Sequence, residues 1–332
     1  MPVPEKSSVK KISRLALISA ALVLLTGCAE LPAAAPISTV DYKACVVEEK
    51  GPTLSPLAAV ADYGVKQAVV TYGINRNRSS VTEVRFADTI AKQLKQGCQL
   101  FVVTGTGFAK QMIEVAKHTQ AANFVYVSDE TNSSLVSANL ENLVVYSVDT
   151  YEAGLLTGFL GAGLTDNSRV LLSLGFSDAF QRGTSDGISK YVATSGNPIE
   201  RIYLMDMMPP NGPTQPDVAL SGGFGETQVQ SWLTGTEFKL VDYGLDQYNV
   251  TALAKLKNRL AVTVEPKLGD KLLELIGSDL EADFIGGSFG SYHATFGNGG
   301  LGITPERDIN LPPALLENLK TVAIDYEASL KK

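Results

Sequence analysis

The sequence predicts an α/β protein of two lobes, each a parallel β-sheet flanked by helices. Short apolar runs alternate with amphipathic stretches of helical period through the first half, and the alternation then repeats in the second half. Such alternation is typical of βαβ units and therefore of parallel sheets. The chain has 332 residues, which is long enough for two domains of about 150 residues.

The first lobe is expected over residues 41–149. Its strands are predicted where β-branched and aromatic residues form short apolar runs, and its helices where apolar residues recur every three or four positions. The predicted strands are 44–47, 68–72, 100–103, 124–127 and 143–146, and the predicted helices are 57–66, 82–95, 109–118 and 133–140.

The second lobe is expected over residues 150–262, with the remaining residues, 263–332, crossing back between the lobes and completing them with a C-terminal helix. A turn is expected at Asn298-Gly299. The predicted strands are 170–174, 201–205, 218–220 and 239–243, and the predicted helices are 151–164, 178–194, 267–276 and 313–330.

The N-terminus has the layout of a secretory signal. Four basic residues and one acidic residue precede an apolar run over residues 15–25, which is shorter than the roughly 20 residues a membrane-spanning helix needs. The run ends in Leu-Thr-Gly-Cys28, which matches the lipobox of bacterial lipoproteins. We therefore expect a signal peptide at 1–27, a lipid on Cys28, a tether at 28–40 and a protein anchored on the extracytoplasmic face of the cell membrane. The alternative is an ordinary signal peptide with an accidental cysteine.

Composition excludes several classes of protein. A net charge of −7 and a pI near 5.0 argue against nucleic-acid binding, which needs a basic surface. The two remaining cysteines, Cys45 and Cys98, fit no zinc pattern, and two histidines, His118 and His293, are too few for a histidine metal site. We expect no metal and no cofactor. The cysteines are either buried thiols or a disulfide.

Two glycine-rich loops follow predicted strands, one in each lobe. They are Thr104-Gly-Thr-Gly-Phe108 and Ser221-Gly-Gly-Phe-Gly225. The first is not a dinucleotide fingerprint, because Lys110 replaces the third glycine. Glycines at the carboxyl end of a strand let a ligand approach the backbone, and open α/β sheets bind ligands at that edge. Thr106 and Phe224 are therefore candidate ligand contacts facing each other across a cleft between the lobes.

The segment Gly175-Phe-Ser-Asp-Ala179 resembles the nucleophile elbow of a serine hydrolase. A strand precedes it, a helix follows, and His293 lies downstream. Ala179 replaces the last glycine of the motif, so we favour the simpler interpretation that Ser177 caps the next helix. Phe176 remains a candidate ligand contact in this loop. A serine hydrolase that uses Ser177 is the least favoured of three functions, and we expect no enzyme.

A second match to the same motif is weaker still. Gly286-Gly-Ser-Phe-Gly290 has no acidic residue between Ser288 and His293, and the residues after it do not read as a helix. The mechanism needs both features. We reject a catalytic role here.

Four short motifs together resemble the basic membrane protein family of solute-binding lipoproteins, which includes purine-nucleoside receptors of ABC transporters. The similarity extends over residues 43–330. The motifs are Tyr151-Glu-Ala-Gly-Leu-Leu-Thr-Gly158, Phe180-Gln-Arg-Gly183 with Gly187, Tyr243-Gly-Leu-Asp-Gln247, and Gly299-Gly-Leu-Gly-Ile-Thr-Pro305.

The resemblance implies a type I periplasmic-binding-protein fold, in which two lobes joined by a hinge close on a small ligand. It also implies site residues. Asp246 matches an aspartate that contacts the ribose of a nucleoside, and Lys267 matches a ligand-binding lysine. Asp129, or Ser128 beside it, falls at a strand-end aspartate of the family.

The first βα turn departs from the family pattern. It offers Glu49 as an acidic ligand contact, but Leu57 stands where the family has a stacking phenylalanine, and Ala58 where it has an amide. A nucleobase would lose an aromatic face and a hydrogen-bonding partner there.

These observations predict a lipid-anchored solute-binding protein of an ABC importer. Its expected partners are a small polar ligand, such as a nucleoside, the transporter permease, and the membrane through its lipid. The alternative from another class is a sensor or assembly lipoprotein on the same fold, whose cleft has lost its ligand.

Overall fold

The computed structural model describes residues 41–50, 56–129, 133–172, 177–204, 215–222, 238–244, 259–305 and 309–331. These residues form helices and two sheets of six strands each. The predicted α/β class is confirmed. Cys28, with the whole of the predicted signal peptide and tether, lies outside the described residues.

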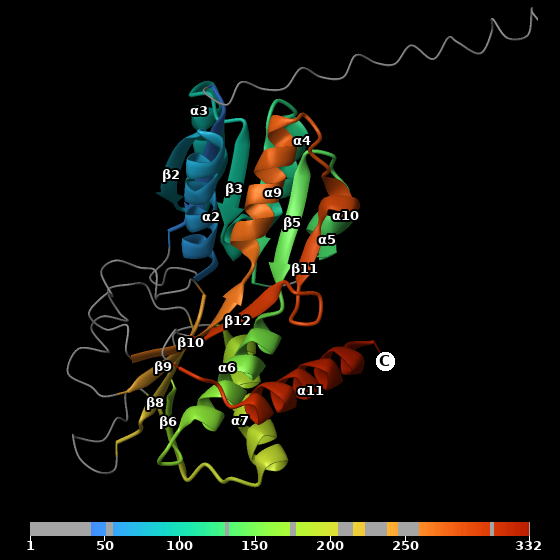
Figure 1. The fold of residues 1–332 in the computed structure, drawn as a ribbon. Helices are drawn as coiled ribbons and strands as arrows, with labels where there is room; N and C mark the ends of the chain where they lie inside the picture. The colour runs from blue at the N-terminus through green and yellow to red at the C-terminus, as the bar shows by residue number, and fades with distance from the viewer. Residues whose placement is uncertain are drawn as a thin grey trace, which may run out of the picture. The chain divides into compact units, whose positions relative to one another are not determined.

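The first sheet has the strand order β11-β5-β4-β3-β1-β2, and every pair in it is parallel (Figure 1). Its carboxyl ends therefore lie along one edge. The strands are β1 (Lys43–Glu49), β2 (Asn75–Val81), β3 (Leu100–Thr104), β4 (Asn123–Ser128), β5 (Leu143–Val148) and β11 (Tyr292–Ala294).

Helices cover both faces of the first sheet. On one face α2 (Pro56–Tyr72) and α9 (Leu268–Leu280) pack side by side (Figure 1). The other face packs against a separate apolar cluster that draws on α3, η2, α4 and α5. The bounds are η1 (Glu83–Arg85), α3 (Phe86–Lys95), η2 (Thr106–Phe108), α4 (Ala109–His118), α5 (Ser133–Ser137) and the short α10 (Gly287–Gly290).

The second sheet has the order β12-β10-β9-β8-β6-β7 and is parallel except that β12 runs antiparallel to β10. Helices α6 (Thr150–Leu164), α7 (Asp178–Ser195) and α11 (Pro313–Leu330) accompany it. The strands are β6 (Arg169–Leu172), β7 (Arg201–Leu204), β8 (Val218–Ser221), β9 (Lys239–Tyr243), β10 (Leu260–Pro266) and β12 (Leu301–Pro305).

Four glycines let α6 and α7 touch backbone to backbone. Gly154 and Gly158 on α6 interlock with Gly183 and Gly187 on α7, and a Cβ built on any of them would lie 2.0 to 2.2 Å from a carbonyl oxygen of the partner helix. Only glycine permits this approach. The glycines of two motifs in the sequence therefore have a packing role.

One predicted strand is wrong. Residues 68–72 continue α2, and the strand that pairs with β1 is the polar segment Asn75–Val81. Ala61, Val65 and Ala68 recur at helical spacing on the buried face of α2. β2 is an edge strand whose side chains are exposed or half-buried, and edge strands are commonly polar because this discourages pairing with other chains.

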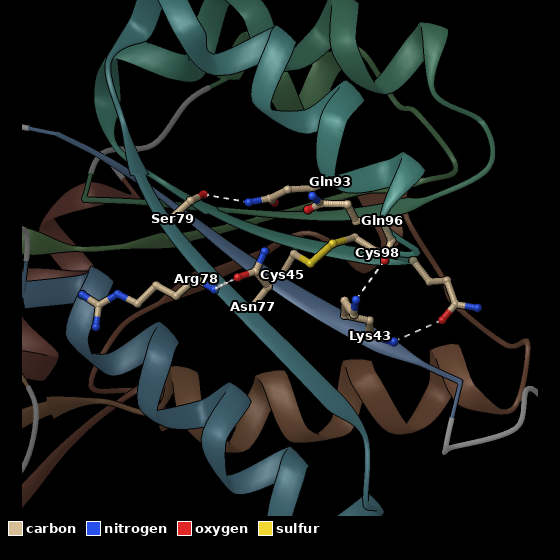
Figure 2. Close-up of a disulfide and its surroundings, with 9 residues drawn as sticks. Lys43, Cys45, Asn77, Arg78, Ser79, Gln93, Gln96 and Cys98 are labelled. Carbon is tan, nitrogen blue, oxygen red and sulfur yellow. Dashed lines mark hydrogen bonds between the residues drawn. A yellow bond between two sulfur atoms is a disulfide. The ribbon is translucent and has the colours of Figure 1, made fainter.

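Cys45 of β1 and Cys98, just before β3, form a disulfide (Figure 2). Both residues are buried in the apolar cluster under α3 and α4. Gln93 of α3 donates a hydrogen bond to Ser79 of β2 beside the bridge. Of the two alternatives that the sequence leaves open for these cysteines, the structure contains the disulfide.

Three described segments connect the two sheets. They run from β5 to α6, from β10 to α9, and from β11 to β12. Backbone hydrogen bonds join them, from Asp149 N to Ala294 O (3.0 Å) and from Lys267 N to Gly300 O (2.8 Å). The predicted turn lies in the third segment, where Gly299 has φ of +76°. We call residues 295–300 the β11–β12 crossing. Among the described helices, none has the length and apolarity needed to span a membrane.

Candidate functional site

Polar residues gather where the strands of the first sheet end. Glu49 closes β1, Gly105 follows β3, Asp129 follows β4 and Asp149 follows β5. Because these strands are parallel neighbours, the four positions share one edge of the sheet. This is the edge at which open α/β sheets bind ligands.

Glu49 occupies the notch left by the glycines of the loop after β3. Its Oε2 accepts a hydrogen bond from Gly107 N at 3.0 Å. A Cβ on Gly107 would lie 2.3 Å from Glu49 Oε1, and Gly105 has φ of +131°. The sequence predicted that these glycines let a ligand approach the backbone. In the structure they let the chain's own carboxylate do so, while Thr106 between them is exposed.

Glu48, the residue before Glu49, has a structural role. It is buried, and its Oε2 lies 2.7 Å from Arg78 Nη2. The same guanidinium lies 3.1 Å from Asp62 of α2. Neighbouring residues of a strand point to opposite faces of the sheet, so Glu48 ties β1, β2 and α2 together while Glu49 lies against the loop after β3.

Asp129 lies where the carboxyl ends of the two sheets come together. Its carbonyl oxygen accepts a hydrogen bond from Thr150 Oγ1 at the start of α6. Tyr243, at the end of β9 in the second sheet, is wholly buried. Burial raises the pKa of Tyr243, and the nearby negative charge of Asp129 raises it further. The Asp129 carboxylate therefore acts on a residue of the other sheet.

Lys267 is at the end of β10 and holds its charge within its own neighbourhood. Its Nζ lies 2.6 Å from Glu265 Oε2, the same oxygen that accepts a hydrogen bond from Thr304 Oγ1 at 3.1 Å. The lysine is about one-third exposed, so it lies at the edge where a ligand is expected. Phe176, Phe224 and Asp246, the other predicted ligand contacts, lie outside the described residues.

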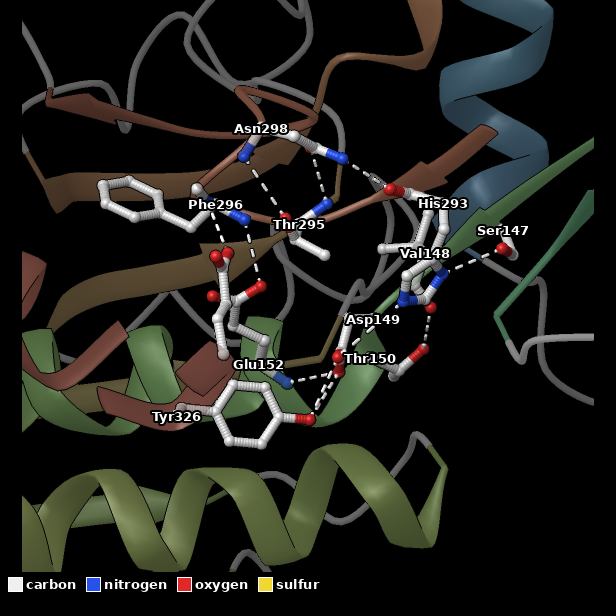
Figure 3. A network of polar contacts seen from close by, with 12 residues as sticks. Ser147, Val148, Asp149, Thr150, Glu152, His293, Thr295, Phe296, Asn298 and Tyr326 are labelled. Atoms are coloured by element: carbon white, nitrogen blue, oxygen red, sulfur yellow. Dashed lines mark hydrogen bonds and ion pairs between the residues drawn. The ribbon is translucent and has the colours of Figure 1, made fainter. Parts of the chain in front are cut away.

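A polar network not predicted from the sequence surrounds Asp149 (Figure 3). Asp149 caps α6 by accepting from Glu152 N at 2.9 Å, and its two oxygens accept from Tyr326 OH at 3.2 and 3.0 Å. His293 lies 3.9 Å from Asp149 through Nε2 and 2.9 Å from Ser147 Oγ through Nδ1. The cap was the one signal in the sequence, since an aspartate directly before a predicted helix favours this role.

The serine positions considered for catalysis have structural partners. Ser177 Oγ accepts a hydrogen bond from Phe180 N at 3.3 Å and so caps α7. Within the described residues it makes no hydrogen bond to His293. Ser288 donates to Asn139 Oδ1 at 3.0 Å. The described part of the chain also contains no cluster of three or more metal-ligating side chains.

Solved structures with this fold are solute-binding proteins of ABC transporters. One from Conexibacter woesei DSM 14684 matches with a TM-score of 0.61 and 14% identity, covering 87% of this chain and 97% of that one. One from Aeropyrum pernix K1 matches with a TM-score of 0.59 and 14% identity, covering 84% and 85%. The fold is that of type I periplasmic binding proteins.

A third structure, a periplasmic solute-binding protein from Actinobacillus succinogenes 130z with bound D-allose, has a TM-score of 0.51. It is 9% identical and covers 80% of this chain and 97% of its own. No family model and no curated sequence matches the chain. At these identities the likeness establishes the fold.

Proposed function

We propose that this protein is the lipid-anchored, extracytoplasmic solute-binding component of an ABC importer. It binds a small polar ligand between the carboxyl edges of its two sheets and carries out no catalysis. One observation carries the proposal: acidic and basic side chains lie at these edges in both sheets, beside the three segments that connect them. Glu49 and Asp129 supply this chemistry from the first sheet, and Lys267 supplies it next to the second.

The chemistry of these residues favours a hydroxyl-bearing ligand. Carboxylates accept hydrogen bonds from hydroxyl groups and hold them more strongly than neutral acceptors do. The allose complex of the Actinobacillus succinogenes protein supports a monosaccharide, and the resemblance to the basic membrane protein family supports a nucleoside. Both ligands carry neighbouring hydroxyl groups, and we propose this class.

The membrane anchor of the proposal rests on the lipobox at Cys28. A thiol-linked lipid holds the protein outside the cell within reach of a permease. Replacing Cys28 with alanine should release the protein from membranes into the soluble fraction. Continued incorporation of labelled fatty acid into Cys28→Ala protein would show that the lipid is attached elsewhere.

A thermal-shift panel tests the binding function. The purified protein is heated with nucleosides, monosaccharides and amino acids, each at several millimolar. A ligand at 100 times its dissociation constant stabilises the folded protein by about 2.7 kcal/mol, which is readily seen as a higher melting temperature. The proposal predicts a rise with a member of the first two classes. That rise should shrink in Asp129→Asn and persist in Glu114→Gln, a control on the exposed face of α4.

A second function has one observation in its favour. The Glu49 carboxylate already fills the Gly105–Gly107 notch, as expected of a sensor or assembly lipoprotein whose cleft no longer takes a ligand. A melting temperature unchanged by all three classes of compound would favour this second function over transport.

A further inference from the structure

Two carboxyl groups hold the β11–β12 crossing from two different helices. Glu152, in the first turn of α6, accepts a hydrogen bond from Phe296 N at 3.0 Å (Figure 3). Glu327, near the end of α11, accepts one from Gly297 N at 2.6 Å. Consecutive amides of the crossing are therefore fastened to both helices, and each fastening depends on a carboxyl oxygen.

The same two carboxyl groups hydrogen-bond to each other. Ionised carboxylates only accept hydrogen bonds, so one of the pair must carry a proton. The side chain of Glu152 is the candidate, because it is wholly buried. Its second oxygen, Oε1, is also buried and receives no hydrogen bond from any N–H or O–H group of the described residues. An Oε1–H group directed at Glu327 satisfies that oxygen.

The charged surroundings favour the protonated form. Asp149 is the third acid of the group, and Tyr326 and His293 are the other titratable side chains close to it. Neither Glu152 nor Glu327 forms an ion pair with a basic side chain of the described part of the chain. Burial raises the pKa of Glu152 to about 8, with the negative charges of Asp149 and Glu327 adding to the effect and the Phe296 N–H opposing it.

We propose that Glu152 and Glu327 form a proton-dependent latch that fastens the β11–β12 crossing to α6 and α11. With the proton in place, both carboxyl groups hold their amides and each other. Without it, two buried negative charges face each other beside Asp149, and like charges in a buried site repel. Deprotonation therefore loosens one of the three connections between the sheets.

The pH range of the latch follows from the two states of Glu152. The latched state holds the proton with a pKa of about 8, and a released, solvated glutamate has an ordinary pKa near 4.3. The latched state is therefore fully favoured below about pH 4.3, loses favour as the pH rises, and reaches its minimum above about pH 8. Within that range its population relative to the released state falls by up to about tenfold per pH unit.

Hydrogen exchange tests the latch without any ligand, so its outcome does not depend on the proposed transport function. Exchange of the peptide that contains Phe296 and Gly297 is followed on the full chain between pH 5.5 and 9, and each rate is divided by the intrinsic rate at that pH. The wild-type protection should fall at least tenfold between pH 5.5 and 8 and then level off. Protection that does not change with pH would overturn the proposal.

Two variants and a control separate the latch from other titrations. Glu152→Gln keeps an acceptor for Phe296 N and a donor for Glu327 but cannot ionise, so its protection should not change with pH. Glu327→Gln should show a smaller fall than the wild type, and serves if the first variant does not fold. Glu317→Gln, an exposed position on the same helix, should behave like the wild type. A full wild-type fall in Glu152→Gln would assign the effect to another group.

Discussion

Replacing Gly158 with alanine should destabilise the second lobe by about 2 kcal/mol. The new Cβ would lie 2.0 Å from Thr184 O of α7, whereas ordinary contact begins near 3.4 Å, so the helices must separate locally by about 1.4 Å. The obstacle is backbone, and no rotamer change relieves it. Overpacking of a core costs about 1–3 kcal/mol, and we expect the upper end. Alanine recovers about 1 kcal/mol through its higher helix propensity.

Gly163→Ala is the matched control for this prediction. It lies on the same helix and gains the same propensity, but its Cβ would meet only the end of the Leu315 side chain, which can rotate away. We therefore expect Gly163→Ala to be close to wild type in stability. Urea unfolding followed by far-UV circular dichroism measures both. If Gly158→Ala proves as stable as Gly163→Ala, the close packing of α6 on α7 is not present in solution.

Three further predictions concern other parts of the chain. Replacing Cys45 and Cys98 together with alanine should cost about 4 kcal/mol of unfolding free energy, because the bridge closes a loop of 53 residues; a double variant as stable as oxidised wild type would show that the bridge does not form. Gly107→Ala should destabilise by about 1–3 kcal/mol, since its Cβ would lie 2.3 Å from a Glu49 oxygen, and Glu49→Ala in the same chain should recover most of that loss; purely additive losses would contradict the contact. Burial raises the pKa of Asp279, so its contribution to stability is complete below about pH 3.9 and is lost as the pH rises through the raised pKa; urea unfolding at pH 4 to 7 should show this loss in wild type and not in Asp279→Asn, and equal pH dependence in the two would refute it.

The sequence allowed most of the first sheet to be predicted, because its buried strands are continuous apolar runs. β2 was missed for the opposite reason: an edge strand needs no apolar face, and Asn75–Val81 has none. β11 was missed because it is only three residues long. Its place beside β5 depends on contacts with residues about 146 positions earlier, which no local pattern records.

The candidate site was predictable only in outline. Parallel strands bring their carboxyl ends to one edge, so the placement of Glu49 and Asp129 there follows from chain order alone. The sequence did not indicate that Glu49 would fill the glycine notch, because this depends on the distance between two neighbouring strands. It also gave no sign of the network around Asp149, whose partners His293 and Tyr326 are distant in sequence.

Native mass spectrometry tests the central claim most directly. The purified chain is incubated with an equimolar mixture of nucleosides, monosaccharides and amino acids, and the mass of the intact complex is recorded. The account predicts a 1:1 adduct whose added mass equals that of one hydroxyl-bearing solute, and a weaker adduct for Asp129→Asn than for Glu114→Gln. A spectrum that contains only the free protein across the whole mixture would contradict a solute-binding function.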